Sequence, residues 1–430
     1  MTKRRFDALV VGAGPAGSVA ALVLARGGAR VALVDKAAFP RDKACGDLIG
    51  PRGVRVLSEL QVEIGGALPV GDMVVVGPSD RRVRLPARAG RTYPDHGVAL
   101  PRRCFDATLR DAAIAAGAEP FVGRAGDALY GDRGLEGFCL ATGAEVRGDV
   151  VIGADGATSR VAAAAELVDA PRVLWAFALR AYVPEPTDLP VIVFWDPTRG
   201  SAFPGYGWMF PGPDGRSNLG LGLGMRSTRG GGAAVARSLP AFVGHLGRLG
   251  LTGSRTHDVP LGGWLKLGMV GTRPAEGRVL LVGDAAGLVN PLQGEGIAPA
   301  LASGRAAAEA FLTNPGCPAT PYRGFLRGTF APYMGATASA HAALLGRPRA
   351  ISAIGRALTV PALGRSLAGT WSLFWNDLVR SGRRGYQPAR DRARPHPPLA
   401  RRRARGPLLK GEPHDGRLPR RLRRRLLRIG

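Results

Sequence analysis

Residues 6–36 read FDALVVGAGPAGSVAALVLARGGARVALVDK, and this stretch decides the fold. Residues 6–11 form an apolar run that is β-branched at its end, which predicts a buried strand. The turn GAGPAG follows at once, and residues 18–26 continue as an Ala/Leu-rich helix. A second apolar run, over residues 30–34, predicts another strand that ends in Asp35. This order of elements predicts a Rossmann-like βαβ unit.

The spacing within this unit indicates a dinucleotide site. Gly12 permits the tight turn, Gly14 lets the backbone approach a pyrophosphate, and Gly17 lets helix and strand pack closely. The N-terminus of the helix directs free N–H groups at the phosphates. Asp35 lies 23 positions after Gly12, where a carboxylate accepts hydrogen bonds from a ribose. An unrelated glycine-rich βα turn is the alternative, and it does not explain Asp35.

The chain is strongly basic, with a formal net charge of +26 over 430 residues. A chain of this length can form two domains that each have a core. Only five of the 59 basic residues are lysine, and this arginine bias, with high Ala and Gly, is typical of GC-rich coding. Much of the charge lies in residues 379–430, a Pro/Arg-rich tail whose composition predicts disorder. The basic residues are not interleaved with aromatic ones, so we do not expect a nucleic-acid partner.

The cysteine and hydropathy patterns argue against several classes of protein. The four cysteines, Cys45, Cys104, Cys139 and Cys317, form no CxxC pair and have no histidine cluster beside them. We therefore expect neither a disulfide framework nor a metal site. No signal peptide precedes the first strand, and no apolar run reaches membrane-spanning length. These features predict a cytoplasmic protein that can rest peripherally on the cytoplasmic face of a membrane.

Two later strands end in further ligand-binding patterns. The strand predicted over residues 148–152 runs into a Gly-Ala-Asp-Gly turn that contains Asp155, which suits a ligand crossing the carboxyl ends of a sheet. The strand over residues 278–282 is followed by Asp284, whose carboxylate can accept hydrogen bonds from sugar or ribityl hydroxyls. Residues 294–296 begin a small-residue helix and offer backbone N–H groups to an anion. Each pattern by itself also fits an ordinary βα turn.

Two other segments carry residues suited to contact with a ring or an apolar substrate. Tyr206, Trp208 and Phe210 alternate, so they share one face of a predicted strand and can line an apolar pocket. A packed sheet face is the alternative, although aromatic residues make up only 6% of the chain. The loop over residues 39–47 contains Cys45, a small thiol that can lie beside a planar ring. A buried, inert cysteine in a surface loop is equally compatible with that segment.

Together these motifs resemble the flavoprotein family with the p-hydroxybenzoate-hydroxylase-like fold. Within that family, FPRDKACG at residues 39–46 and PGYGWMFP at residues 204–211 are similar to the geranylgeranyl reductase branch. The spacing of tyrosine, tryptophan, phenylalanine and proline in the second segment is a specific marker of the branch, and all fixed positions match. The resemblance covers about residues 5–378 and departs after Asp377, where the chain becomes rich in Arg and Pro.

The resemblance implies an α/β fold. A Rossmann-like FAD-binding domain would carry an inserted antiparallel-sheet substrate domain of α+β type and a C-terminal helical region. The FAD-binding domain would comprise residues 1–68, 99–170 and 271–330. The substrate domain would comprise residues 69–98 and 171–270, followed by C-terminal helices at residues 331–378 and the basic tail at residues 379–430.

The resemblance also implies which residues form the site. FAD would be held by Gly12, Gly14, Pro15, Ala16, Gly17, Asp35, Lys36, Cys45, Gly46, Arg102, Ala125, Asp155, Gly283, Asp284, Gly294, Gly296 and Ile297. The channel for a polyprenyl chain would be lined by Tyr206, Trp208, Phe210 and Pro211. Cys45 is also the candidate proton donor, and no metal ligand is implied.

The expected reaction is reduction of an isoprenoid C=C bond, with hydride from reduced flavin and a proton from an acid of the protein. Members of the family act on chlorophyll precursors, archaeal lipids and menaquinone. The residues leave open the lipid head group, the bonds that are reduced and the oligomeric state. No second GxGxxG follows a strand, so NAD(P)H or another electron donor would reduce FAD only transiently.

Two other functions are compatible with the sequence. A flavin monooxygenase or halogenase uses the same fold, although a halogenase usually carries a WxWxIP-like signature that this chain lacks. A basic protein that binds membranes or nucleic acids is the non-enzyme alternative, and only the tail supports it. That tail is functional, disordered or the product of a shifted reading frame, since GC-rich DNA read out of frame tends to encode Arg and Pro.

Overall fold

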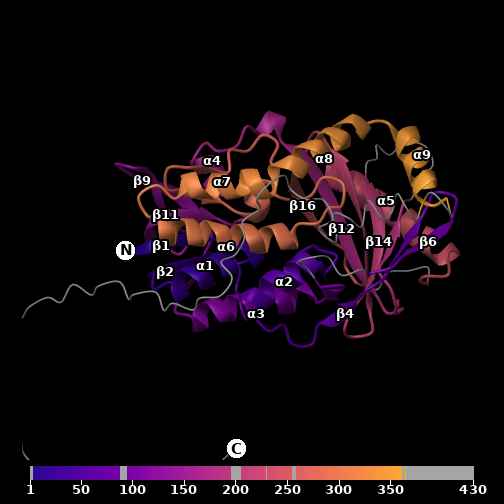
Figure 1. Cartoon of the computed structure of the whole chain (residues 1–430), viewed down its shortest axis with the longest axis horizontal. Coiled ribbons are helices and arrows are strands. Elements are labelled where there is room, and N and C mark those ends of the chain that lie inside the picture. Colours follow the sequence, from indigo (N-terminus) through magenta and orange to yellow (C-terminus); the bar gives the residue numbers. More distant parts are fainter. Residues whose placement is uncertain are drawn as a thin grey trace, which may run out of the picture. The chain divides into compact units, whose positions relative to one another are not determined.

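The computed structural model describes residues 3–87, 94–194, 205–228, 230–253, 258–360 and 364 (Figure 1). The predicted basic tail, the last part of the predicted C-terminal helices and Pro204 lie outside the described residues. Two larger sheets and the helices packed against them make up most of the described chain.

The N-terminal strand lies inside a mostly parallel sheet. β1 (Lys3–Val11) pairs in parallel with β2 (Val31–Asp35) on one side and with β11 (Glu145–Gly153) on the other. The remaining strands are β8 (Glu119–Val122), β9 (Ala125–Gly131), β10 (Gly134–Leu140), β17 (Ala275–Glu276) and β18 (Val279–Leu281). Their order is β17-β18-β11-β1-β2-β8, and the β9–β10 hairpin extends from β11. Ala8 and Val10 are fully buried, as expected for a strand that is covered on both faces.

Helix α1 (Pro15–Arg26) packs between α6 (Ile297–Thr313) and α3 (Arg102–Ala115) against this sheet (Figure 1). The contact between α1 and α6 is close enough to bring backbone against backbone. A Cβ atom on Gly304 of α6 would lie 2.1 Å from the carbonyl oxygen of Ala16. The other helices near this sheet are α2 (Pro51–Glu59), α4 (Arg160–Ala164) and α7 (Ala319–Thr329).

The second sheet carries the aromatic motif. Its strands are β5 (Met73–Val76), β6 (Arg82–Leu85), β12 (Leu174–Val183), β13 (Val191–Val193), β14 (Gly205–Pro211), β15 (Ser217–Met225) and β16 (Leu261–Leu267). Their order is β16-β12-β15-β14-β13-β5-β6, and all neighbours are antiparallel except β13 and β5. Helix α5 (Gly231–Arg248) covers one face, where a Cβ on Gly207 would lie 2.1 Å from the Phe242 ring. Trp208 and Phe210 belong to the opposite face, which is therefore free to line a cavity.

Short elements connect the two sheets. β3 (Leu48–Ile49), β7 (Gly97–Ala99) and β4 (Leu68–Val70) form a small third sheet, and two 3-10 turns are η1 (Ala170–Arg172) and η2 (Gly283–Ala286). Helices α8 (Ala331–Leu344) and α9 (Pro348–Leu358) follow α7, and Ile351 of α9 packs against the core of the second sheet. Among the helices of the described residues, none combines the length and apolar character needed to cross a membrane.

The predicted α/β architecture is confirmed, with differences at the level of single elements. The βαβ unit and the antiparallel sheet with the aromatic motif are both present. The sequence analysis did not predict the β9–β10 hairpin or α5. It also did not predict where α3 starts, which is at Arg102. Arg102 therefore lies in the first turn of a helix. The assignment of residue ranges to FAD-binding and substrate domains stays a prediction.

We expect Gly304→Ala to destabilise the protein because its Cβ would push α6 away from the backbone of α1. Overpacking of this kind costs about 1–3 kcal/mol, measured as the free energy of unfolding in urea. Gly324→Ala in α7 is the matched control, since nothing lies within 4 Å of its Cβ position. The control should stabilise the protein by about 0.5–1 kcal/mol through helix propensity. Equal effects of the two substitutions would contradict a tight contact between α1 and α6.

Candidate functional site

The carboxyl ends of several parallel strands converge at the glycine turn. Gly12 N donates to Val34 O on β2 at 2.7 Å, and Ala154 N donates to Val11 O on β1 at 2.7 Å. Gly12 has a φ of 104°, and a Cβ there would lie 2.3 Å from the Ala154 carbonyl oxygen. Both facts require glycine at this position. The first N–H groups of α1, which have no partner within the helix, begin directly after this turn.

Asp35 holds the turn from the end of β2. Its carboxylate accepts hydrogen bonds from Ala13 N at 2.8 Å and from Ala37 N at 2.9 Å. A carboxylate offers about four lone-pair positions, so these two bonds leave capacity for hydroxyl groups of a ribose. The side chain is 12% exposed, which keeps it reachable by a ligand.

Two arginines lie beside the glycine turn and share one buried carboxylate. A Cβ on Gly14 would lie 3.6 Å from a guanidinium nitrogen of Arg41 and 3.9 Å from one of Arg102. Asp106 accepts hydrogen bonds from Arg102 Nε and Nη2 at 2.7 Å each and from Arg41 Nη1 at 2.7 Å. Burial lowers the pKa of Arg102, but the charge and hydrogen bonds of Asp106, together with Cys45, raise it overall. Arg41 Nη2 also lies 3.9 Å from Asp35 Oδ2. Two guanidinium groups next to the α1 N-terminus suit a pyrophosphate.

The turn η2 brings Asp284 to the same region. A Cβ on Gly283 would lie 3.2 Å from the Cβ of Ala16, so this turn abuts the start of α1. Lys43 Nζ lies 3.7 Å from Asp284 Oδ2. Lys266, which is 1% exposed, donates to the carbonyl oxygen of Ala285 at 2.5 Å. Burial lowers the pKa of Lys266 to about 8, although nearby carboxylates oppose this shift.

Three predicted FAD ligands do not present a free side-chain group to the region around Arg41 and Arg102. The Asp155 carboxylate accepts from Ser159 Oγ at 2.5 Å and from Arg160 N at 2.7 Å, so it caps the start of α4. Ala125 is buried at the start of β9, and the Lys36 side chain is exposed. Their contact with a cofactor stays a prediction.

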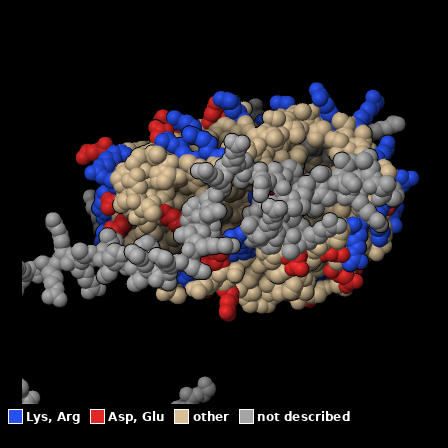
Figure 2. All heavy atoms as spheres, viewed as in Figure 1, with Lys and Arg blue, Asp and Glu red and all other residues tan. Residues whose placement is uncertain are grey.

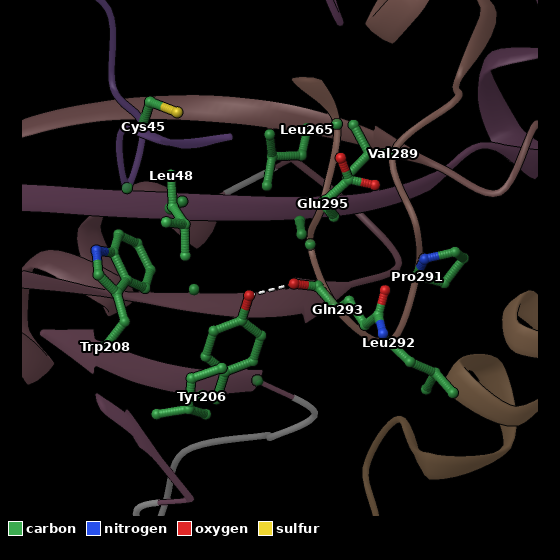
Figure 3. Close-up of a pocket in the computed structure, with 18 of the residues that line it drawn as sticks. Cys45, Leu48, Tyr206, Trp208, Leu265, Val289, Pro291, Leu292, Gln293 and Glu295 are labelled. Atoms are coloured by element: carbon green, nitrogen blue, oxygen red, sulfur yellow. Dashed lines mark hydrogen bonds between the residues drawn. The ribbon is translucent and has the colours of Figure 1, made fainter. Parts of the chain in front are cut away.

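A largely apolar cavity of about 480 Å³ opens between the two sheets (Figure 3). Its walls at one end include Pro15, Cys45, Gly46, Arg102, Asp284, Gly294, Gly296 and Ile297, all predicted FAD contacts. Its middle is lined by Tyr206, Trp208 and Phe210 from β14, while Pro211 at the end of β14 does not line it. Ile351, Ile354 and Leu358 of α9 also line the cavity. The cavity therefore joins the predicted flavin edge to an apolar channel.

The aromatic side chains of β14 hold two loops of the cofactor side in place. The Tyr206 hydroxyl donates to the carbonyl oxygen of Gln293, as the dashed line in Figure 3 shows. A Cβ on Gly46 would lie 2.9 Å from the Phe210 ring and 3.3 Å from Trp208 Nε1, so both rings press against this glycine. The aromatic residues of β14 thus form an apolar wall of the cavity, and their contacts also fix the distance between this sheet and the Cys45 loop.

Asn218 on β15 fixes the position of Trp208, and the sequence analysis missed it. Its Oδ1 accepts from Trp208 Nε1 at 3.0 Å, and its Nδ2 donates to Cys45 O and to Asp47 Oδ2 at 2.8 Å each. Asp47 also accepts a hydrogen bond from the hydroxyl of Tyr182, and it has a φ of 61°. A single asparagine in a glycine-rich strand gives no sequence signal for this role, because its partners Cys45 and Asp47 are more than 170 residues away.

Two acidic groups line the cavity beside the predicted flavin edge. Burial raises the pKa of the Cys45 thiol, so this cysteine is protonated near neutral pH. Burial also raises the pKa of the Glu295 carboxyl, against an opposing hydrogen bond that Ala298 N donates to its Oε1 at 2.9 Å. The sequence analysis considered residues 294–296 only for their backbone N–H groups and missed this side chain. Within the part of the chain that the structure describes, no cluster of His, Cys, Asp or Glu could hold a metal ion.

Comparison with known proteins identifies a family model, relatives and a solved structure that this chain resembles. Residues 5–172 match the FAD binding domain family. A menaquinone reductase from Mycolicibacterium smegmatis is 35% identical over 316 residues, which is 71% of this chain and 76% of that protein. A geranylgeranyl diphosphate reductase from Rhodobacter capsulatus is 33% identical over 322 residues, which is 71% of this chain and 75% of that protein.

A solved structure shares the fold. The crystal structure of a geranylgeranyl bacteriochlorophyll reductase-like protein from Thermoplasma acidophilum superposes with a TM-score of 0.69. The match covers 86% of this chain and 96% of that one, at 23% identity.

The residues present fit FAD. The pyrophosphate would meet the α1 N-terminus with Arg41 and Arg102, and the ribose would meet Asp35. The ring would lie where Cys45, Gly46 and the start of α6 line the cavity. Arg41 is a further cation that the structure brings to the pyrophosphate region.

We expect iodoacetamide at pH 8 to alkylate Cys104 and Cys317, which are exposed, well before Cys45. The raised pKa of the Cys45 thiol leaves little thiolate, the reactive form. The measurement is mass spectrometry of tryptic peptides over a time course, and the reaction of Cys45 should accelerate as the pH increases. A Cys45 that reacts first would show that its thiolate is stabilised instead.

Proposed function

This chain belongs to the geranylgeranyl reductase family of FAD-dependent oxidoreductases, and we propose that it saturates C=C bonds in the polyprenyl chain of a lipid. A menaquinone or another isoprenoid lipid is the proposed substrate. The observation that supports this most directly is the apolar cavity that leads from Cys45 and Gly296 past the β14 rings to α9. A polyprenyl chain offers only apolar surface and π bonds, which is what these walls can recognise.

When bound, FAD supplies the hydride for this reaction. The side chains of Tyr206, Trp208 and Phe210 would hold one isoprene unit at the ring and exclude water from it. An isolated alkene is a poor hydride acceptor, so positioning and water exclusion must provide much of the rate. The α6 N-terminus, whose first N–H groups lack helical partners, would stabilise negative charge on the reduced ring.

The electron donor is proposed to bind only transiently. The glycine turn at residues 12–17 is the one strand-led GxGxxG of the sequence, and it is assigned to FAD. NAD(P)H or a protein donor would therefore reduce the cofactor and leave before the lipid reacts.

We expect the FAD-loaded protein, reduced without oxygen, to add two hydrogen atoms to a menaquinone for each C=C bond that it saturates. After the anaerobic incubation the lipid is reoxidised to the quinone, because reduction of the quinone ring also adds two hydrogen atoms. Mass spectrometry then measures the gain in the prenyl chain, and protein stripped of FAD is the control. A product that instead gains an oxygen atom, and forms only in air, would favour the monooxygenase alternative and contradict the reductase.

We further propose that α9 meets the membrane surface where the lipid enters. Ile351, Ile354 and Leu358 share the side of α9 that lines the cavity, and Ile354 is 43% exposed. Arg347, Arg349 and Arg356 are exposed on and before the same helix. Figure 2 shows Lys and Arg side chains along the rim of the molecule near α9. Apolar residues flanked by arginines are the pattern by which a helix lies on an anionic bilayer.

We expect the combined substitution of Arg347, Arg349 and Arg356 by Glu to slow reduction of a menaquinone in anionic vesicles by more than about tenfold. Each arginine near an anionic surface contributes about 1 kcal/mol of attraction. The rate with the same lipid in neutral detergent micelles should stay unchanged. Substitution of the exposed Arg103, Arg133 and Arg172 by Glu is the matched control. An equal loss with vesicles and micelles would mean that α9 does not act at the membrane.

A further inference from the structure

Glu295 lies between the proposed flavin edge and the apolar channel of the cavity. It lies in the loop between η2 and α6, next to Gly294 and Gly296, and it lines the cavity together with Cys45 and Tyr206. Figure 3 shows Glu295 among cavity residues that come from β14, β16 and the loop before α6. Part of its surface stays accessible although it lies deep in the protein, because the cavity passes beside it.

The surroundings of Glu295 are poor in compensating charge. Val289 and Leu265 line the cavity near it, and its Oε1 accepts one hydrogen bond, from Ala298 N at 2.9 Å. The nearest charged or titratable groups are Arg52 from α2, Tyr206 from β14, Cys45 from the loop before β3, and Asp284 from η2. Lys43, Arg102 from α3 and His341 from α8 line the same cavity. The charge of Arg52 favours the carboxylate form of Glu295, and burial outweighs it.

Glu295 brings a carboxyl group to the part of the cavity that the Cys45 thiol and the Tyr206 phenol also line. Burial raises the pKa of the Cys45 thiol and of the Tyr206 phenol, both of which are weaker acids than a carboxyl group from the start. The same burial raises the pKa of the Glu295 carboxyl and so favours its protonated form. A carboxyl group whose pKa is raised by burial, and which lines the cavity next to the proposed flavin edge, suits a general acid.

We propose that Glu295 is the catalytic residue that donates the proton in the reduction of the alkene. This inference rests on the proposed function. The π bond of the alkene breaks, one carbon receives hydride from reduced FAD, and the other carbon receives the proton as the Glu295 O–H bond breaks. Two electrons leave FAD, which ends oxidised, and Glu295 ends as a carboxylate that water reprotonates before the next turnover. The Ala298 N–H and the α6 N-terminus lie where they stabilise that carboxylate.

The substitution Glu295→Gln distinguishes a role of Glu295 as an acid from a role as a cap of α6. The amide oxygen of glutamine can still accept the hydrogen bond from Ala298 N, but the amide does not act as an acid. We expect this variant to fold, to bind FAD with an unchanged absorbance spectrum, and to be reduced by dithionite as fast as the unmodified protein. Reoxidation by a prenyl lipid that has no quinone ring, so that only its C=C bonds can accept the electrons, should slow by about 10²–10⁴-fold in a single anaerobic turnover. Glu309→Gln, at the other end of α6 and paired with Arg305, is the matched control and should keep the original rate.

Two further measurements make the outcome decisive. Infrared difference spectra of the FAD-loaded protein should show a protonated carboxyl band that titrates above the ordinary range of glutamate and is missing in Glu295→Gln. Glu295→Asp should restore part of the single-turnover rate with a shifted pH profile, because it restores an acid. The proposal is overturned if Glu295→Gln reacts at the original rate, if Cys45→Ala alone abolishes reoxidation, or if the band persists in Glu295→Gln. A protein that reduces no prenyl lipid even with Glu295 intact overturns the proposed function instead.

Discussion

The backbone contact between α1 and α6 is the constraint on which the rest of the site depends. It joins the first turn of the chain to a helix almost 300 residues later, and Gly304 is the residue that lets Ala16 approach. Because α1 begins at the glycine turn and α6 begins beside Glu295, their mutual position sets the distance between the phosphate region and the flavin edge. In the proposed binding mode, helix N-termini would face the pyrophosphate and the flavin ring of one long cofactor.

The second sheet is tied to this frame through the polar ends of apolar side chains. Tyr206 and Trp208 present rings to the cavity while their O–H and N–H groups bond Gln293 and Asn218. Such side chains combine a large apolar surface with one directional bond. Asn218 also donates a hydrogen bond to the Cys45 backbone. The aromatic side chains of β14 and the proposed flavin edge therefore belong to one hydrogen-bonded unit.

The sequence predicted those features whose signals are local. The βαβ unit follows from glycines and an acid within residues 12–35, and β14 follows from alternation over five residues. The start of α3 at Arg102 was not predictable in this way, since Pro101 precedes it and provides no side-chain cap. The grouping of Arg41, Arg102 and Asp106, and the surroundings of Glu295, arise only when distant loops fold together. Individual residue types carry no signal for such groupings.

The position of α9 has an evolutionary consequence. Its cavity-lining residues, Ile351, Ile354 and Leu358, come from a single short helix near the end of the described chain, whereas the cofactor side is built from elements before it. Substitution of those three side chains changes the depth and shape of the far end of the cavity and leaves the phosphate-binding and ring-binding residues as they are. Selectivity for the length of a prenyl chain can therefore diverge between relatives faster than the redox chemistry that they share.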